Sequence, residues 1–213
     1  MTVTINGTGT IAGLSTGGLP DGSVDEDSLA TGAVTSGKLG SAAVTSGKIA
    51  SGAVTPTPKT VQTHVIVTST QSLTGGAKTN ITNLNATITP TAGTKILVTV
   101  RVAGEGSHAS HNETSFGIHR DTTVIGNPDA ASGRRVAMCM ISINSHPDSS
   151  STPDMANYSY LDSPSTGSAI TYHAYIHVGS SQTWYNNRTV ADSDSEPFER
   201  ITSSITLQEV IAP

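Results

Sequence analysis

The stretch KILVTVRV, residues 95–102, decides the class of fold that this sequence can adopt. Ile96, Val98, Val100 and Val102 alternate with residues of mixed polarity, and successive side chains of a β-strand point to opposite faces of its sheet. The stretch therefore predicts a strand whose isoleucine and valines face a hydrophobic core. A helix is a poor alternative, because β-branched residues at every second position favour a pleated sheet.

Similar apolar and β-branched stretches recur along the chain beyond its first sixty residues. They lie at residues 61–67, 116–118, 136–143, 172–178 and 201–210. Clusters of Gly, Pro, Asn, Asp and Ser separate them and are typical of turns. No segment has a convincing helical pattern, and about eight strands over roughly 150 residues predict a β-sandwich. We therefore expect an all-β domain over residues 61–213.

The composition excludes several classes of protein. The chain has 213 residues, of which 13% are charged, and its net charge is −5. Proteins that bind nucleic acids need a dense face of Lys and Arg, so we expect no nucleic-acid partner. The single cysteine, Cys139, excludes an internal disulfide. No apolar run reaches the length of about 18 residues that indicates a membrane-spanning helix, so we expect no insertion into a membrane.

Residues 23–60 have a different character, because they contain a ten-residue repeat. The sequence AVTSGKLG at residues 33–40 is followed by AVTSGKIA at residues 43–50. Thr35 and Thr45 are each suited to cap a single helical turn. The repeat places apolar side chains five residues apart, at Val24, Leu29, Val34, Leu39, Val44, Ile49 and Val54.

A five-residue spacing suits neither regular element of secondary structure. Five residues rotate an α-helix by about 500°, and in a strand an odd spacing alternates between the two faces. One chain therefore cannot bury these side chains against itself. Two interpretations stay open: a disordered linker, favoured by the content of Gly, Ser and Thr, or a stalk in which several chains meet along one axis. The regular register favours the stalk, in which each apolar side chain packs against its symmetry mates.

The opening TINGTGTI at residues 4–11, the stretch LPDGSV at residues 19–24 and the repeats resemble small structural proteins of tailed bacteriophages. These include tail fibres, head fibres and trimeric capsid-decorating, or cement, proteins. The ending ITSSITLQEV at residues 201–210 is similar to the final strand of the trimeric, TNF-like jelly rolls at the tips of such proteins. The resemblance implies a jelly-roll sandwich and a homotrimer.

The resemblance also implies three parts: a particle-binding anchor at residues 1–22, a stalk at residues 23–60 and a jelly-roll knob at residues 61–213. The expected function is non-enzymatic: a protein of the virion surface that decorates and stabilises the capsid, with capsid protein as its partner. The alternative is a short tail fibre or receptor-binding adhesin, whose partners would be a tail protein and a host surface glycan. An enzyme that degrades polysaccharide is the third class.

The sequence predicts no catalytic, cofactor or metal site. The sequence GLSTG at residues 13–17 matches a nucleophile elbow, but no core strand precedes it and no helix follows it. The acidic run at residues 192–199 lies on one expected loop, where carboxylates are usually solvated. His173 and His177 are about 13 Å apart in a strand, too far to share one metal ion. His108, His111, Glu113 and His119 lie close in sequence, and a trimer axis could bring three copies of one histidine together. The alternative, which we favour, is that these histidines are solvent-exposed or hydrogen-bonded on a loop and a sheet face.

One cluster of aromatic and polar side chains lies outside the simple alternation. Its members are Trp184, Tyr185, Asn187 and Arg188. Aromatic rings beside amides suit contacts with carbohydrate or protein, so these residues are the candidate surface for recognition. The alternative is that they form a corner of the core or part of a trimer interface.

Overall fold

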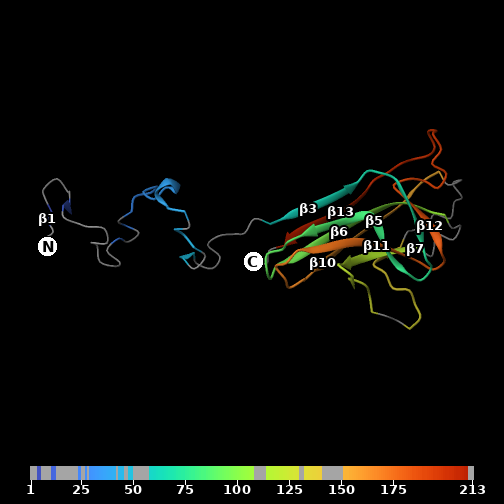
Figure 1. Ribbon diagram of the computed structural model, residues 1–213, viewed down its shortest axis with the longest axis horizontal. Helices are drawn as coiled ribbons and strands as arrows, with labels where there is room; N and C mark the ends of the chain where they lie inside the picture. The colour runs from blue at the N-terminus through green and yellow to red at the C-terminus, as the bar shows by residue number, and fades with distance from the viewer. Residues whose placement is uncertain are drawn as a thin grey trace. The chain divides into compact units, whose positions relative to one another are not determined.

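The computed structural model describes most of the chain. It covers residues 58–107, 114–129, 132–140 and 151–210, and within the first fifty residues it covers 4–5, 11–12, 24, 27, 29–41, 43–45 and 48–49. The chain divides into two compact units, Met1–Thr55 and Pro56–Pro213 (Figure 1). The sequence predicts two boundaries, after residues 22 and 60, whereas the compact units have a single boundary, after Thr55.

The second unit is built from strands, as expected, and its described residues contain no α-helix. The strands are β3 (Thr60–Val65), β4 (Ser69–Leu73), β5 (Lys78–Ile88), β6 (Lys95–Gly106), β7 (Thr114–Arg120), β8 (Thr123–Ile125), β9 (Cys139–Met140), β10 (Asp154–Asp162), β11 (Ile170–Val178), β12 (Gln182–Asn186) and β13 (Ser203–Val210). The apolar run at residues 136–143 contributes only the short β9, and residues 141–143 lie outside the described part. The polar strands β5 and β10 have no counterpart among the expected ones.

The strands form two antiparallel sheets that pack face to face. In the first sheet, one edge of β6 pairs with β10, and the other edge pairs with β13 over Lys95–Arg101 and with β12 over Gly104–Gly106. The outer edges of β13 and β12 then pair with β3 and β4. In the second sheet, β11 lies between β5 and β7, and the remaining edge of β7 pairs with β8 and β9.

β12 and β13 are two segments of one strand line. Asn186 ends β12 opposite Gly104, and Ser204 of β13 lies opposite Arg101 on the same edge of β6. The chain therefore leaves the sheet after β12 and returns to the same line where β13 begins. We call the intervening residues 187–202 the insertion.

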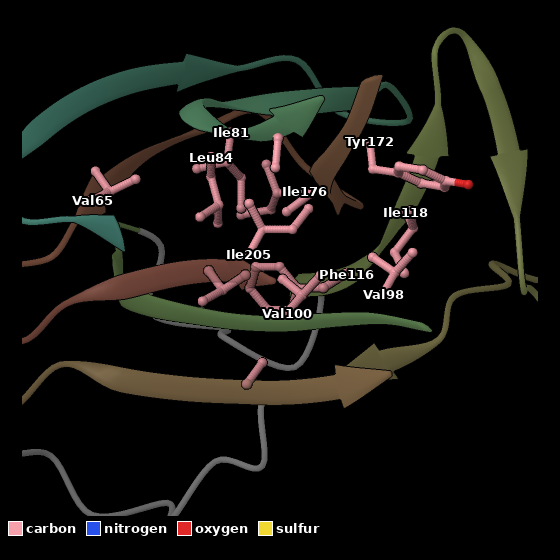
Figure 2. Packing of buried hydrophobic residues seen from close by; sticks show 14 of the residues in the cluster. Val65, Ile81, Leu84, Val98, Val100, Phe116, Ile118, Tyr172, Ile176 and Ile205 are labelled. Atoms are coloured by element: carbon pink, nitrogen blue, oxygen red, sulfur yellow. The ribbon is translucent and has the colours of Figure 1, made fainter. Parts of the chain in front are cut away.

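The core lies between the two sheets (Figure 2). The inner face of β6 supplies Ile96, Val98, Val100 and Val102, none of them more than 1% exposed. Arg101, on the opposite face, is exposed, which confirms the expected orientation of this strand. Burial of each such side chain contributes roughly 1.5–3 kcal/mol. The second sheet contributes Ile81, Leu84, Phe116, Ile118, Tyr172, Ala174 and Ile176 to the same cluster.

A buried carboxylate ties the two sheets together at one end of the core. Asp162, the last residue of β10, lies 3.1 Å from Nη1 of Arg120, the last residue of β7. The hydroxyl of Tyr172, in β11, donates a hydrogen bond of 2.7 Å to the same carboxylate. The charge of Asp162 is thus paired and hydrogen-bonded, as a buried charge must be.

A second buried carboxylate, that of Glu209, anchors the chain where it enters the sandwich. Glu209 is 2% exposed, and its oxygens accept hydrogen bonds from the backbone N–H groups of Lys59 and Thr91 and from the hydroxyl of Thr94. Burial by itself raises the pKa of Glu209, but these hydrogen bonds outweigh burial and lower the pKa to about 2. The carboxylate is therefore ionised in the folded protein down to strongly acidic pH.

The lowered pKa of Glu209 predicts part of the acid sensitivity of the sandwich. A carboxylate with a depressed folded pKa stabilises the fold above its unfolded pKa, and this contribution is lost as the pH falls through the folded pKa. We expect Glu209→Gln to lower the free energy of unfolding at pH 7 by about 1–3 kcal/mol, because it weakens charge-assisted hydrogen bonds. The difference from the wild type should shrink between pH 5 and pH 2.

Urea unfolding of both proteins across this pH range measures the effect. Glu196→Gln, at an exposed position, is the matched control and should match the wild type throughout. A Glu209→Gln deficit that stays constant down to pH 2 would contradict the assignment.

Candidate functional site

The ten-residue sequence repeat is also a repeat of local structure. In the first copy, the N–H of Ala33 donates to the carbonyl of Ala30 at 2.8 Å, and the N–H of Lys38 donates to the carbonyl of Thr35 at 2.9 Å. The Lys38 ammonium also donates to the carbonyl of Ala33 at 2.7 Å. A single 3-10 turn, η1 (Ser36–Lys38), follows Thr35, as the sequence predicts.

The same three hydrogen bonds recur ten residues later. The N–H of Ala43 donates to the carbonyl of Gly40 at 3.0 Å, and the N–H of Lys48 donates to the carbonyl of Thr45 at 2.9 Å. The Lys48 ammonium donates to the carbonyl of Ala43 at 3.1 Å. Each repeat therefore makes the same three hydrogen bonds within itself, and no apolar side chain takes part in them.

The apolar side chains of the repeat are exposed in the single chain. The exposed fractions lie between 44% and 53% for Val24, Leu29, Val34, Leu39 and Val44. Ile49 is partly exposed, and Val54 lies outside the described residues. One chain does not bury this register, so it is available to a partner.

The predicted recognition cluster divides into buried and half-exposed members. Trp184 and Asn187 are each 1% exposed, so the single chain holds them in its interior and not on a surface. Trp184 packs edge-on against Phe116 of the second sheet, with ring centroids 5.7 Å apart, and is thus the corner of the core that the sequence left as the alternative. Tyr185 and Arg188 are partly exposed, with 17% of the Arg188 side chain accessible, and they remain candidates for recognition.

Asn187 is the residue that holds the insertion in place. Its backbone has φ of 61°, in the left-handed region, and its N–H donates to the carbonyl of Ala103 at 2.9 Å. Its side-chain amide donates to the carbonyls of Val65 and Val67, at 2.7 and 3.0 Å, and accepts a 2.7 Å hydrogen bond from the hydroxyl of Ser203. The side-chain amide of Asn187 thus joins the two ends of the insertion to each other and to β3, and its backbone N–H joins the first end to β6.

Arg188 organises the exposed side of the insertion. Its guanidinium lies 4.5 Å from the centre of the Tyr185 ring, donates to the hydroxyl of Thr70 at 3.0 Å and lies 3.6 Å from Asp192. Asp192 is also held at 2.9 Å by Arg200, whose hydrogen bonds hold the pKa of that carboxyl below its usual range. This part of the acidic run is therefore engaged with arginines.

Part of the acidic run lines an open hollow of about 450 Å³ on the insertion. Its walls include Asp194, Glu196 and Phe198 beside the Asp192–Arg200 pair.

In the described part of the chain, no group of three or more His, Cys, Asp or Glu residues could hold a metal ion. The nucleophile-elbow match at residues 13–17 lies outside the described residues. Cys139 is half-buried, and burial raises the pKa of its thiol.

The outer face of the first sheet is a further surface that sequence reasoning did not single out. It is formed by the side chains of β3, β6, β10 and β13 that alternate with the core positions. It carries Thr60, Gln62, His64, Leu97, Thr99, Met155, Asn157, Ser159, Leu161, Ser204, Thr206, Gln208 and Val210, with Lys95 and Arg101 at its opposite ends. Among the described residues of these strands, Lys95 and Arg101 are the exposed charged side chains on this face, because Glu105 is buried and accepts a hydrogen bond from the N–H of Val190. Met155, Leu161 and Val210 are exposed apolar residues. The face is nearly neutral, which suits burial against another protein surface.

No protein-family model matches the chain, and no curated protein matches its sequence. Among the described residues there is no helix with the length and apolar character needed to cross a lipid bilayer.

The buried amide of Asn187 predicts a large effect of its removal. Asn187→Gly keeps the left-handed backbone accessible but deletes the side-chain hydrogen bonds, so we expect the free energy of unfolding to fall by about 2–4 kcal/mol. Asn83 has a similar φ of 63° but is exposed, so Asn83→Gly is the matched control and should be nearly neutral. Chemical denaturation of the two variants measures the difference. Equal stability of the two would mean that the amide does not hold the insertion.

Proposed function

We propose that this chain is a non-enzymatic structural protein of a phage virion: a homotrimeric capsid-decorating protein with an anchor, a stalk and a jelly-roll knob. The observation that carries the proposal is the repeat, in which residues 30–48 use the same local hydrogen bonds every ten residues and leave a regular apolar register unburied. A linker has no physical need for such a register. A bundle of identical chains does need a regular register, because the register lets each apolar side chain be buried against its symmetry mates.

The strand pairing supports a jelly roll for the knob. β3 with β4, β8 with β9 and β12 with β13 each occupy one strand line, which leaves eight lines in chain order. The first line pairs with the eighth, the second with the seventh, the third with the sixth and the fourth with the fifth. This is the order of a long antiparallel hairpin rolled into two four-stranded sheets, as in a jelly roll.

The outer face of the first sheet supports a trimeric knob. Its mostly uncharged side chains leave little charge to be desolvated at an interface, and its apolar members Leu161, Leu97 and Val210 lie in neighbouring strands at one end. That end is also where the chain enters the sandwich, since Thr60 pairs with Gln208. Association along the stalk and across this face would therefore reinforce each other.

The anchor would be the segment at residues 1–22. Within it, β1 (Thr4–Ile5) and β2 (Ile11–Ala12) pair antiparallel, with Ile5 opposite Ile11. So small an element can make only a small contact with a particle. A trimer multiplies this contact threefold and a capsid lattice offers many copies of its binding site, so multivalency compensates for a weak single contact.

The alternative function, a short tail fibre or adhesin, is favoured by one observation. Tyr185 lies opposite Glu105 at the Gly106 end of β6 and carries Arg188 over its ring, whereas the chain enters the sandwich near the Lys95 end, where Thr60 pairs with Gln208. In Figure 1, β12 lies at the opposite end of the sandwich from the start of β3. β6 has 12 residues, and a strand of that length spans about 37 Å. A half-exposed aromatic ring with a stacked guanidinium, far from the point of entry, is suited to contact a host surface glycan.

Copy number and position on purified particles distinguish the two functions. Quantitative mass spectrometry and antibody labelling should find hundreds of copies on the capsid, and a variant that lacks residues 1–22 should keep its folded sandwich but fail to attach. A few tens of copies or fewer, located at the tail, would contradict capsid decoration and favour the adhesin.

The stalk register predicts a specific effect of charge. Leu39→Asp places a carboxylate in the apolar register, and we expect it to raise the concentration at which the trimer dissociates at least tenfold, because it removes roughly 1.5–3 kcal/mol of burial per chain. Ser41→Asp adds the same charge two residues away, outside the register, and should leave assembly unchanged. Sedimentation velocity over a dilution series measures both. Equal dissociation of the two variants would contradict a stalk built on this register.

A further inference from the structure

Two histidines that are far apart in the sequence are direct neighbours on the second sheet. The register pairs His173 of β11 with His119 of β7. Directly opposed residues of antiparallel strands project from the same face, with Cβ atoms about 4.5–5.5 Å apart. The residues that alternate with them, Ile118, Tyr172 and Ala174, are in the core, so both imidazoles lie on the outer face of the sheet. Both are half-buried there.

The ring of His119 is held in one orientation. Its Nδ1 lies 2.6 Å from Oδ1 of Asn80, in β5, and its ring centroid lies 4.7 Å from that of Tyr175. Tyr175 is itself fully buried, and its hydroxyl donates to Oδ1 of Asn127 at 3.1 Å. The Tyr175 ring lies across Gly117, where a Cβ atom would be only 2.4 Å from the ring atoms. The rigid tyrosine therefore fixes one side of the His119 imidazole.

This orientation leaves one nitrogen of His119 free to bind a ligand. The amide oxygen of Asn80 accepts hydrogen bonds only, so Nδ1 of His119 carries the proton and Nε2 keeps its lone pair. An imidazole whose other nitrogen donates to a carbonyl oxygen is the arrangement that metal-ligating histidines adopt in proteins. The neighbouring imidazole of His173 supplies a second nitrogen donor on the same face.

We propose that His119 and His173 form a two-imidazole site for a late first-row divalent metal ion, Zn²⁺, Ni²⁺ or Cu²⁺. Such ions favour imidazole nitrogen as a ligand. No third His, Cys, Asp or Glu joins the pair among the described residues, so water completes the coordination. Burial lowers the pKa of both imidazoles below its ordinary value.

The site would join the central strands of the second sheet. His119 lies in β7 and His173 in β11, so one ion would cross-link the two strands on the face away from the core. A ligand that binds only the folded state stabilises it in proportion to the logarithm of its concentration over the dissociation constant. The ion therefore raises the melting temperature of the sandwich.

Titration calorimetry of the full chain with Zn²⁺ and Ni²⁺, together with thermal melts, tests the site. We expect one ion per chain, a higher melting temperature with Zn²⁺, and at least a tenfold loss of affinity in His119→Ala and in His173→Ala. Asn80→Ala should weaken binding by a smaller factor, because it releases the His119 ring without removing a ligand. His64→Ala, on the first sheet, is the matched control and should bind as the wild type does.

Circular dichroism of each variant shows whether the sheet is intact, and His119→Gln and His173→Gln replace any alanine variant that fails to fold. Binding that survives in both the His119 and the His173 variants would overturn the proposal. So would binding that is lost in His108→Ala or His111→Ala but kept in those variants, and so would an absence of binding at millimolar Zn²⁺.

Discussion

The two paired edges of β6 are the constraint on which the rest of the sandwich depends. β10 occupies one edge of this strand, and β13 and β12 share the other, so three of its neighbours take their register from it. Val98, Val100 and Val102 all point into the core and are at most 1% exposed. Because side chains alternate between faces, a slip of one residue would turn all three valines to the outer face. The nearly neutral outer face of the first sheet follows from the same register.

The interruption of a single strand line links the core to the candidate recognition surface. β12 and β13 follow one edge of β6, and the insertion leaves that line after β12 and returns to it at β13. The buried side chain of Asn187 holds the two ends of the insertion through hydrogen bonds. These hydrogen bonds of Asn187 keep the neighbouring Arg188 over the ring of Tyr185 and within 3.6 Å of Asp192. A surface that carries a rigid aromatic ring and a fixed guanidinium is thus produced by one buried amide.

Strict alternation made part of this fold predictable from the sequence. β6 has β-branched residues at alternate positions, and β11 and β13 have apolar residues at alternate positions over much of their length, so each of the three strands was expected. β5 was not, because its buried residues Ile81, Leu84, Ala86 and Ile88 change spacing across a bulge where its pairing with β11 shifts. β10 was missed because its inward positions include tyrosines and an aspartate, whose burial depends on hydrogen bonds that only the folded structure supplies.

The candidate sites were less predictable than the strands for a physical reason. The pairing of His119 with His173 and the fastening by Asn187 depend on strand register, and register joins residues that are more than fifteen positions apart in the chain. The sequence left Trp184 open between a recognition surface and a corner of the core or an interface, and the alternation of β12 turns Gln182, Trp184 and Asn186 inward together. The repeat, in contrast, could be predicted from the sequence, because its local structure depends only on nearby residues: its hydrogen bonds span at most five positions.

The central claim is that the apolar register of the repeat is completed by identical chains. The local hydrogen bonds of each repeat are satisfied within one chain, whereas Val34, Leu39 and Val44 are not buried by it. The molar mass of the intact wild-type protein at micromolar concentration, determined by light scattering, tests this most directly. The account predicts the mass of three chains, and a stable species with the mass of one chain would contradict it.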